Sequence, residues 1–443
     1  MFYEDVRCGE LLYRYMLWRS GYKSLMKRSS ISTGERITFL LLFAGYIAYY
    51  LTRKNITIAS ISMKELGLLT IAQIGYLSSL GTVCYAIGKF TNGFLADSIG
   101  GKRTFLIGML GSVAASVLFS ISSQYHLFLL FWGVNSYFLS MGWVGLIKVC
   151  SYWFGGPNRG TVLGWMSLNY QMGSSISKVF TAFLVGFPVL IWRGLFFVPA
   201  IVLLIMAVVV FIFLSEKPDT VPDTESSNAE HPPGAPAGSE GSSLRWIQLL
   251  KSPAFLLILW GSASITLIRT FFDDFTALWL NESGMQLDKA GYISALFTLG
   301  GMVGTVLVGY LSDRVGKGNR GPYMIASGCF LGILLFSSGF FPKDSVTLSM
   351  VFFFLTGIAV YGVYSVLAGV SAIDFGGNVA PSTAAGIIDG VGYLAAGGAG
   401  ILVAGIKNIG EWESITLNFA VLTVVLSLSL LPLWRRYPTK SIA

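Results

Sequence analysis

The chain has 443 residues, of which 54% are hydrophobic and only 12% charged, with a mean hydropathy of +0.68 and a formal net charge of +8. This composition excludes an ordinary water-soluble globular protein. Basic patches interleaved with aromatic residues are absent, so the positive charge gives no reason to expect nucleic acid as a partner. The composition indicates a membrane protein with the lipid bilayer as its main partner.

Residues 1–35 are basic and lack the apolar stretch of a cleavable signal peptide. Twelve apolar runs follow, each near the roughly 20 residues that a helix needs to cross a bilayer. The runs lie near 36–58, 71–96, 104–123, 126–152, 160–186, 192–214, 253–279, 290–312, 322–341, 346–373, 382–407 and 413–434. We therefore expect an all-α membrane protein with twelve transmembrane helices.

The two halves of the chain are related by a repeat of 216 residues. Residues 75–97 and 291–313 align at that offset without a gap and share nine identities in 23 positions. A segment rich in Pro, Gly, Ser and Glu separates the halves and predicts a flexible linker. The expected domains are a basic N-terminal segment (1–35), a six-helix bundle (36–215), the linker (216–250), a second six-helix bundle (251–435) and a tail (436–443).

Basic residues concentrate in the N-terminal segment, in alternate loops and after the last run. Because cytoplasmic loops carry the excess of Lys and Arg, this pattern places both termini, the linker and the tail in the cytoplasm. Three of the four cysteines lie within predicted spans and no spacing suits a metal; both histidines lie in predicted loops. We expect neither a metal site nor a cofactor, and no enzyme activity.

Two arginines occupy equivalent places in the repeat. Arg53 ends the run ITFLLLFAGYIAYYLTR, and Arg269 lies within FLLILWGSASITLIR. A charge at the centre of a bilayer costs roughly 2.5–3.5 kcal/mol on insertion scales, so such residues usually mark a substrate path. Guanidinium suits bidentate capture of phosphate or carboxylate, which predicts an anion carrier with one arginine from each half. The alternatives are snorkelling to an interface or, for Arg269, an ion pair with Asp273 four residues later.

Other polar residues in the predicted spans are further candidates for the site. Asp389, in the eleventh run, would pair with a lysine of the other half, bind sugar hydroxyls or titrate during transport. Lys178 is a candidate for the cavity or for a structural role. Candidate substrate contacts are Lys89, Lys148, Asn169, Tyr170 and Tyr361. Candidate gating residues, which would clamp neighbouring helices from cytoplasmic loops, are Asp97, Arg103, Asp313, Arg314 and Arg320.

Several short motifs resemble one group of membrane carriers. They are YYLTRKN (49–55), GKF (88–90), GWVGLIK (142–148), RTFFDDF (269–275), GNRG (318–321) and YG (361–362). With the two six-helix halves and the Gly-x-x-x-Asp loops, they resemble the major facilitator superfamily and, within it, the organophosphate:phosphate antiporters. TAAGIIDGVGYL (383–394) is similar to vertebrate sugar-phosphate exchangers of the endoplasmic reticulum.

The resemblance implies that Arg53 and Arg269 are paired phosphate ligands and that Lys89 is an accessory cation. It also singles out Tyr49, Asp274 and Tyr361 as substrate contacts. The chain departs from the family where a His-Asn pair is usual, since it reads LNYQMG (168–173) there. It departs again where the family's Asp-Trp-Ser-Pro becomes Asp-Phe-Thr-Ala (274–277).

Residues and resemblance together predict a secondary transporter that exchanges an organophosphate, such as a sugar phosphate or glycerol 3-phosphate, for inorganic phosphate by alternating access. One alternative is a transporter-like sugar-phosphate sensor, because the family includes such receptors. Another is a carrier of a different organic anion such as a hexuronate. The resemblance implies a monomer in the inner membrane of a bacterium, or in the endoplasmic reticulum or another internal membrane of a eukaryote.

Overall fold

The structure is a computed structural model that describes residues 33–154, 159–187, 190–218, 251–314, 321–338, 345–370 and 381–436. The regular secondary structure of these residues is helical throughout. The basic segment 1–32, residues 219–250 of the linker and residues 437–443 of the tail lie outside the described part of the chain.

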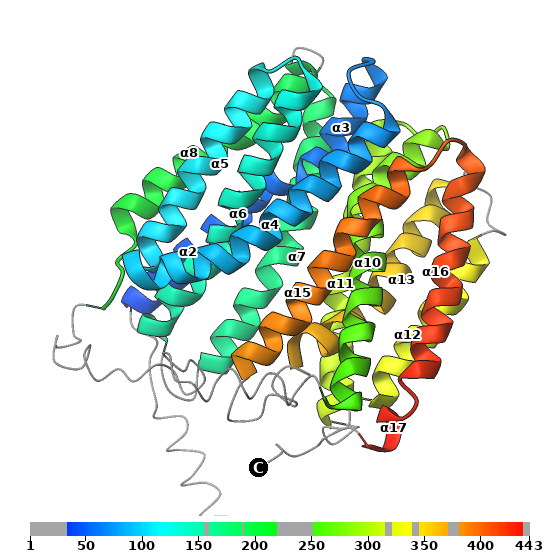
Figure 1. Ribbon diagram of the computed structural model, residues 1–443. Coiled ribbons are helices and arrows are strands. Elements are labelled where there is room, and N and C mark those ends of the chain that lie inside the picture. Colours follow the sequence, from blue (N-terminus) through cyan, green and yellow to red (C-terminus); the bar gives the residue numbers. More distant parts are fainter. Residues whose placement is uncertain are drawn as a thin grey trace, which may run out of the picture.

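Each half contributes helices for six passes across the bilayer (Figure 1). The first half contains α2 (Thr33–Lys54), α3 (Ile56–Glu65), α4 (Ile71–Ile99), α5 (Gly101–Ile121), α6 (Tyr125–Trp153), α7 (Arg159–Val185) and α8 (Ile191–Phe213). The second half contains α10 (Pro253–Glu282), α11 (Leu287–Arg314), α12 (Gly321–Ser337), α13 (Val346–Tyr364), the π-helical turn η4 (Ser365–Val370), α15 (Pro381–Ala404), α16 (Ile409–Ser429) and the short α17 (Leu433–Arg436). The twelve-helix arrangement expected from the sequence is confirmed, with α2 and α3 together making the first pass.

The repeat extends well beyond the segment that aligns in sequence. Helices α4 and α11 begin at residues 71 and 287, and α8 and α16 end at residues 213 and 429, which in both cases is a separation of 216 residues. One difference stands out, because α10 is continuous through Arg269 whereas its counterpart breaks at Asn55, directly after Arg53 and Lys54. The buried Asn55 side chain donates from Nδ2 to the Leu195 carbonyl of α8 at 3.0 Å.

Two long helices of the first half are unusually polar for segments that cross a membrane. Nine helices of the described part are long and apolar enough to cross a membrane. Helices α2 and α7 are not among them, although both exceed 20 residues. Charged and polar side chains, including Arg53, Lys54 and Lys178, lower their hydropathy. A polar membrane helix must turn its polar face toward protein or a water-filled cavity.

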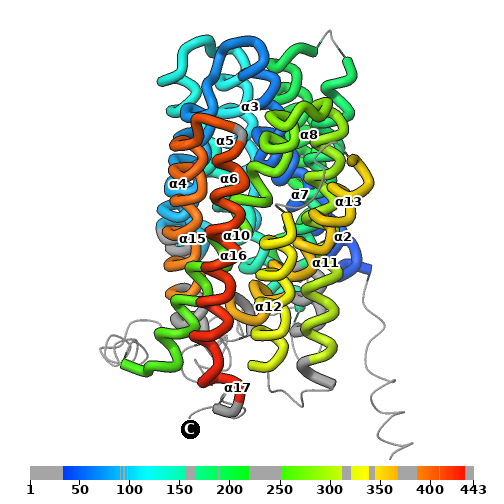
Figure 2. Tube along the Cα trace, turned by 90° about the vertical axis from the view of Figure 1, so that its right-hand side faces the viewer, coloured from blue at the N-terminus to red at the C-terminus, as the bar shows by residue number. Residues whose placement is uncertain are grey.

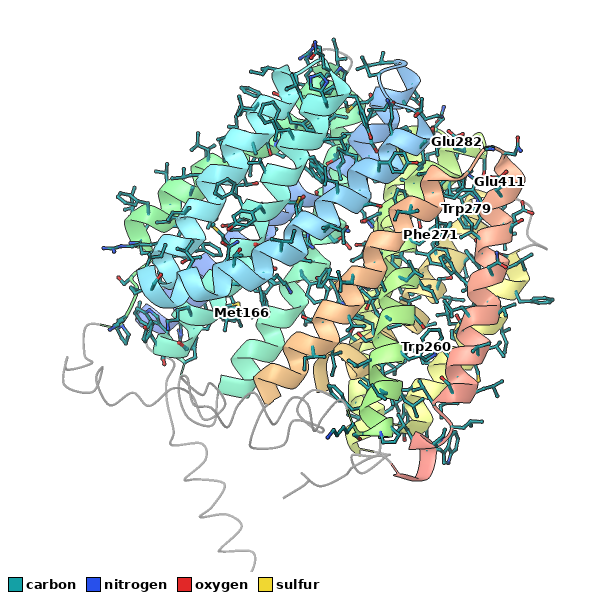
Figure 3. All side chains as sticks on the ribbon, viewed as in Figure 1. Met166, Trp260, Phe271, Trp279, Glu282 and Glu411 are labelled. Carbon is teal, nitrogen blue, oxygen red and sulfur yellow. The ribbon has the colours of Figure 1, made fainter. Side chains whose placement is uncertain are left out.

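The two halves pack together at one end, here called the closed end, which holds the loops at 66–70, 283–286 and 405–408 (Figures 1 and 2). There Lys64 of α3 forms an ion pair with Glu282 of α10. Next to it, Asn281 Nδ2 donates to a Glu65 carboxylate oxygen at 3.2 Å. Figure 3 places Glu282 near this end and Phe271 and Trp279 deeper within the second half.

Close packing of α4 against α15 continues from the closed end toward the middle. A methyl group on Gly75 would overlap the carbonyl oxygen of Gly400, so the two backbones touch at this point. One turn along α4, the Ser79 hydroxyl donates to the Gly397 carbonyl at 2.7 Å. Small residues permit this approach between helices in lipid.

The opposite end of the first half holds the start of the linker. Glu216 accepts hydrogen bonds from the backbone N–H groups of Gly101 (2.7 Å) and Lys102 (2.6 Å) at the first turn of α5. A carboxylate there satisfies unpaired donors and complements the positive end of the helix dipole. Gly100 makes the sharp turn from α4 with a φ of 93°, a conformation that favours glycine.

Candidate functional site

A cavity of about 440 Å³ lies between the two halves. Its wall is formed by α2, α3, α4, α6 and α7 of the first half and by α10, α11, α13, η4 and α15 of the second. The wall from α6 is mainly aromatic and apolar and includes Trp132, Leu139 and Trp143. The charged groups lie where α2, α4, α10 and α15 face one another.

Arg53, in the last turn of α2, points into this cavity. Its Nη1 donates to the Tyr50 hydroxyl at 3.0 Å, and its guanidinium carbon lies 3.9 Å from the centre of the Tyr85 ring. A guanidinium over an aromatic face is stabilised by the ring quadrupole without being neutralised. No described carboxylate forms an ion pair with it, so its positive charge remains available to a ligand.

Arg269 has the equivalent setting in the second half. Its guanidinium carbon lies 4.2 Å from the centre of the Tyr364 ring and 5.8 Å from that of Tyr361. The side chain is 9% exposed, and its buried Nε has no hydrogen-bond partner among the described residues. Because a buried donor without a partner is costly, this N–H is suited to an acceptor that arrives with a ligand.

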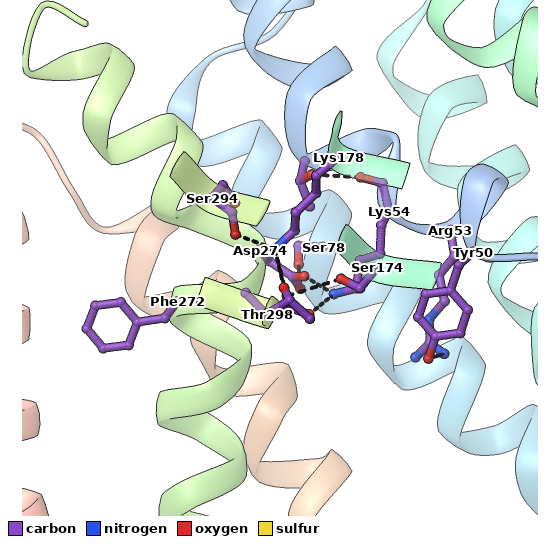
Figure 4. A network of polar contacts seen from close by, with 12 residues as sticks. Tyr50, Arg53, Lys54, Ser78, Ser174, Lys178, Phe272, Asp274, Ser294 and Thr298 are labelled. Atoms are coloured by element: carbon purple, nitrogen blue, oxygen red, sulfur yellow. Dashed lines mark hydrogen bonds and ion pairs between the residues drawn. The ribbon is translucent and has the colours of Figure 1, made fainter. Parts of the chain in front are cut away.

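The lysines around the arginines are already paired with aspartates. Lys54 Nζ contacts Asp273 at 2.5 Å and also forms an ion pair with Asp274. Lys178, fully buried in α7, contacts the other oxygen of Asp273 at 2.7 Å. Lys54 and Lys178 thus converge on these carboxylates of α10. Figure 4 shows Arg53 and Tyr50 to one side of Lys54 and Asp274. Both pairings join the first half to the second.

A further ion pair joins the halves at another part of the cavity wall. Lys89 Nζ of α4 lies 3.6 Å from a carboxylate oxygen of Asp389 in α15. The same ammonium is 4.9 Å from the centre of the Tyr393 ring. The sequence left three alternatives for Asp389, and the structure shows one of them, an ion pair with a lysine of the other half.

The resulting balance of charge favours an anion. Three lysines and three aspartates form ion pairs that cancel their charges, namely Lys54, Lys89 and Lys178 with Asp273, Asp274 and Asp389. Arg53 and Arg269 remain as two positive charges with no carboxylate partner in the described residues. Two guanidinium groups match the charge of one phosphate dianion and offer it paired donors.

The cavity brings together most of the expected substrate contacts. Its lining includes Arg53, Lys89, Tyr170, Arg269, Asp274, Tyr361 and Asp389. Tyr49, Lys148 and Asn169 do not line the cavity that the described residues form. Tyr49 instead donates its hydroxyl to the Phe105 carbonyl at 2.5 Å inside the first half, and the buried Asn169 contacts Met166 within α7.

Of the expected gating residues, only the side chain of Arg103 is described by the structure. Arg103 is exposed in the first turn of α5. The side chains of Asp97, Asp313 and Arg314, and the whole of Arg320, lie outside the described part of the chain. Their gating role therefore stays a prediction.

The cavity residues that the sequence reasoning missed include Lys54, Tyr85 and Tyr393. Lys54 directly follows Arg53, and of the two the sequence predicted a site role for Arg53 alone. Tyr85 and Tyr393 have rings 5.6 Å apart and close the space between Arg53 and Lys89. Tyr393 lies one turn after Asp389, so helical spacing alone could have placed it on the same face.

Comparison with known proteins assigns the family. Residues 42–404 match the model of the Major Facilitator Superfamily, which covers most of the chain. The chain therefore belongs to this superfamily of membrane transporters, and it is not an enzyme. Its curated relatives include proteins named as transporters of hexose phosphate and of glycerol 3-phosphate.

Three of these relatives carry different functional names. The probable hexose phosphate transport protein of Chlamydia pneumoniae is 28% identical over 417 residues, with 89% of this chain and 90% of that protein covered. The membrane sensor protein UhpC of Salmonella typhimurium is 25% identical (90% and 91% covered). The glycerol-3-phosphate transporter of Bacillus subtilis is 24% identical (80% and 82% covered).

Solved structures share the fold at lower identity. A bacterial homologue of the human lysosomal transporter Spinster, in an inward-facing and unoccupied conformation, superposes with a TM-score of 0.75 at 15% identity and covers 91% of this chain and 98% of its own. A D-xylose–proton symporter gives a TM-score of 0.71 at 13% identity, covering 92% and 99%. These similarities establish the fold alone.

We expect Asp273→Asn to destabilise the protein by about 3–5 kcal/mol, because it leaves the fully buried Lys178 without its carboxylate. Asp274→Asn is the matched control and should cost much less, since Lys54 keeps its bond to Asp273. Unfolding of the purified proteins in detergent measures both effects. Adding Lys178→Met to Asp273→Asn should restore part of the loss; equal losses in the two single variants would contradict the network.

Proposed function

We propose that the chain is a secondary transporter that exchanges an organophosphate, such as a sugar phosphate or glycerol 3-phosphate, for inorganic phosphate. The observation that carries the proposal is the pair of uncompensated arginines, Arg53 and Arg269, in one cavity between the halves. The names of the hexose-phosphate and glycerol-3-phosphate relatives support the same substrate class. The phosphoryl group binds between the guanidiniums, and the organic part occupies the rest of the cavity.

The charges also supply a reason for exchange. Closing an empty cavity would remove water from two guanidinium groups of the same sign, which is costly in a medium of low dielectric constant. A bound phosphate neutralises them and permits the halves to rock about the site. The empty carrier returns slowly, so phosphate on one side must be exchanged for phosphate or an organophosphate on the other.

The ion pairs of the closed end form the barrier on one side of the membrane. Access from that side requires Lys54, Lys178 and Lys64 to separate from their carboxylates in α10. Basic residues in the terminal segments and alternate loops favour a cytoplasmic location for the opposite end. In this proposal the closed end faces away from the cytoplasm, and both termini lie inside the cell.

A sensor is the second candidate, because one relative of similar identity is named a membrane sensor protein. A sensor would keep the same arginines and bind the same phosphate compounds. It differs in that ligand binding would occur without flux. Measuring binding and transport on the same preparation separates the two functions.

Arg53→Lys and Arg269→Lys should each lower counterflow of labelled phosphate in proteoliposomes by about tenfold or more, because an ammonium group cannot supply paired donors. Arg193→Lys is the matched control, since Arg193 donates to the Ser120 carbonyl at 2.6 Å, away from the cavity. The control should retain most of the rate. Near-normal transport in both cavity variants would rule out the proposed site.

Efflux of labelled phosphate from loaded proteoliposomes should need phosphate or an organophosphate on the outside. The physical reason is the cost of closing the unloaded cavity over two arginines. Glycerol 3-phosphate, glucose 6-phosphate and glucuronate, tested separately outside, identify the exchanged class. Equal efflux into anion-free buffer would refute obligatory exchange, and stimulation by glucuronate alone would mean that the arginines bind a carboxylate.

A further inference from the structure

We propose that Asn135 is a positioning residue for Arg53: its buried amide fixes the last turn of α2, and so holds the guanidinium in the cavity. This inference rests on the proposed phosphate site. Asn135 lies in α6, is 1% exposed and does not line the cavity. It acts through the backbone of α2, one residue before Arg53.

The last turn of α2 presents three consecutive side chains to three different neighbours. Thr52 is fully buried and faces α5 and α6, Arg53 lies against Tyr85 of α4, and Lys54 pairs with carboxylates of α10. Successive residues of a helix differ by about 100° in direction. A rotation or shift of this turn therefore displaces both Arg53 and the ion pair that Lys54 forms with the other half.

Three buried polar residues on three helices hold that turn in a closed ring of hydrogen bonds. Asn135 Nδ2 donates to the Thr52 carbonyl at 3.0 Å, and Asn135 Oδ1 accepts from the Ser112 hydroxyl at 2.5 Å. The Ser112 and Thr52 hydroxyls lie 3.0 Å apart and close the ring. The Thr52 hydroxyl also donates to the Tyr49 carbonyl at 3.1 Å, so it keeps a partner if the ring is broken. Loss of Asn135 instead leaves the buried Thr52 carbonyl without its side-chain donor.

The Thr52 carbonyl needs this donor because of where α2 ends. The last four carbonyl groups of a helix have no donor within it, and α2 ends at Lys54, before the break at Asn55. A buried carbonyl left unpaired is costly, and the turn would relax to find another donor. Such relaxation moves Arg53 relative to Arg269, which belongs to the other half.

The second half supports this assignment by contrast. The positions 216 residues after the ring members are Ile268, Gly328 and Val351, none of which has a polar side chain. There α10 runs without a break through Arg269 to Glu282. The polar ring thus accompanies the broken helix and is not a general feature of the repeat.

The test is equilibrium binding of labelled inorganic phosphate to purified Asn135→Leu, with Asn92→Leu as the matched control. Asn92 is also a buried amide that donates to α6, at 2.7 Å to Ser140 Oγ, but it lies away from Arg53. We expect Asn135→Leu to weaken phosphate binding about tenfold, because the unpaired Thr52 carbonyl favours a shift of the turn that carries Arg53. The control should bind like the wild type.

A double-mutant cycle separates positioning from general damage to the fold. In the Arg53→Lys background, Asn135→Leu should cause little further loss of phosphate affinity, because the residue acts through Arg53. In the Arg269→Lys background, Asn135→Leu should lower phosphate affinity by the same factor as in the wild type. If Asn135→Leu does not fold, Ser112→Ala replaces it and should show the same pattern with a smaller loss.

Equal effects of Asn135→Leu and Asn92→Leu on phosphate affinity would overturn the inference, as would additive losses in the Arg53→Lys background. If either of these results is obtained and the wild-type protein binds phosphate, the proposed function still stands. A wild-type protein that binds no phosphate would instead overturn the proposed function and this inference with it.

Discussion

The ion pairs of Lys54, Lys89 and Lys178 with neighbouring aspartates leave Arg53 and Arg269 as the unmatched charges of the described cavity. This selective pairing decides the chemistry of the centre, because six of the eight charged groups cancel within the protein. Tyrosine rings hold the two guanidinium groups in place without neutralising them. An incoming dianion is then the remaining counter-charge, which suits a phosphate compound better than a neutral sugar.

The proposed phosphate-binding residue and a residue of the ion pairs between the halves are neighbours in one helical turn. Arg53 faces the cavity, while Lys54 reaches across to α10 and helps to keep the closed end shut. Under the proposed function, phosphate at Arg53 would therefore act on the same turn that carries an ion pair between the halves. The break at Asn55 and the hydrogen bonds of Asn135 define that turn, so the coupling depends on residues that never touch the ligand.

The sequence predicted the twelve helices, the repeat and the two arginines, because intramembrane charge and a 216-residue offset are readable without coordinates. It did not predict the partner of Asp273. Helical spacing offered Arg269 as an alternative partner, yet Asp273 pairs with Lys178 and Lys54 of the other half. Such pairing depends on how the two bundles dock, which local sequence does not encode. Tyr49, next to Tyr50 in the sequence, lies inside the first half and not in the cavity, because its hydroxyl bonds to the Phe105 carbonyl.

The number of phosphate ions bound per chain tests the central claim most directly. If one dianion bridges Arg53 and Arg269, saturation binding of labelled phosphate to purified protein should give one site. The single variants Arg53→Ala and Arg269→Ala should each weaken that same site. Two phosphates per chain, with each variant losing one and leaving the other unaffected, would show two independent anion sites and contradict the account.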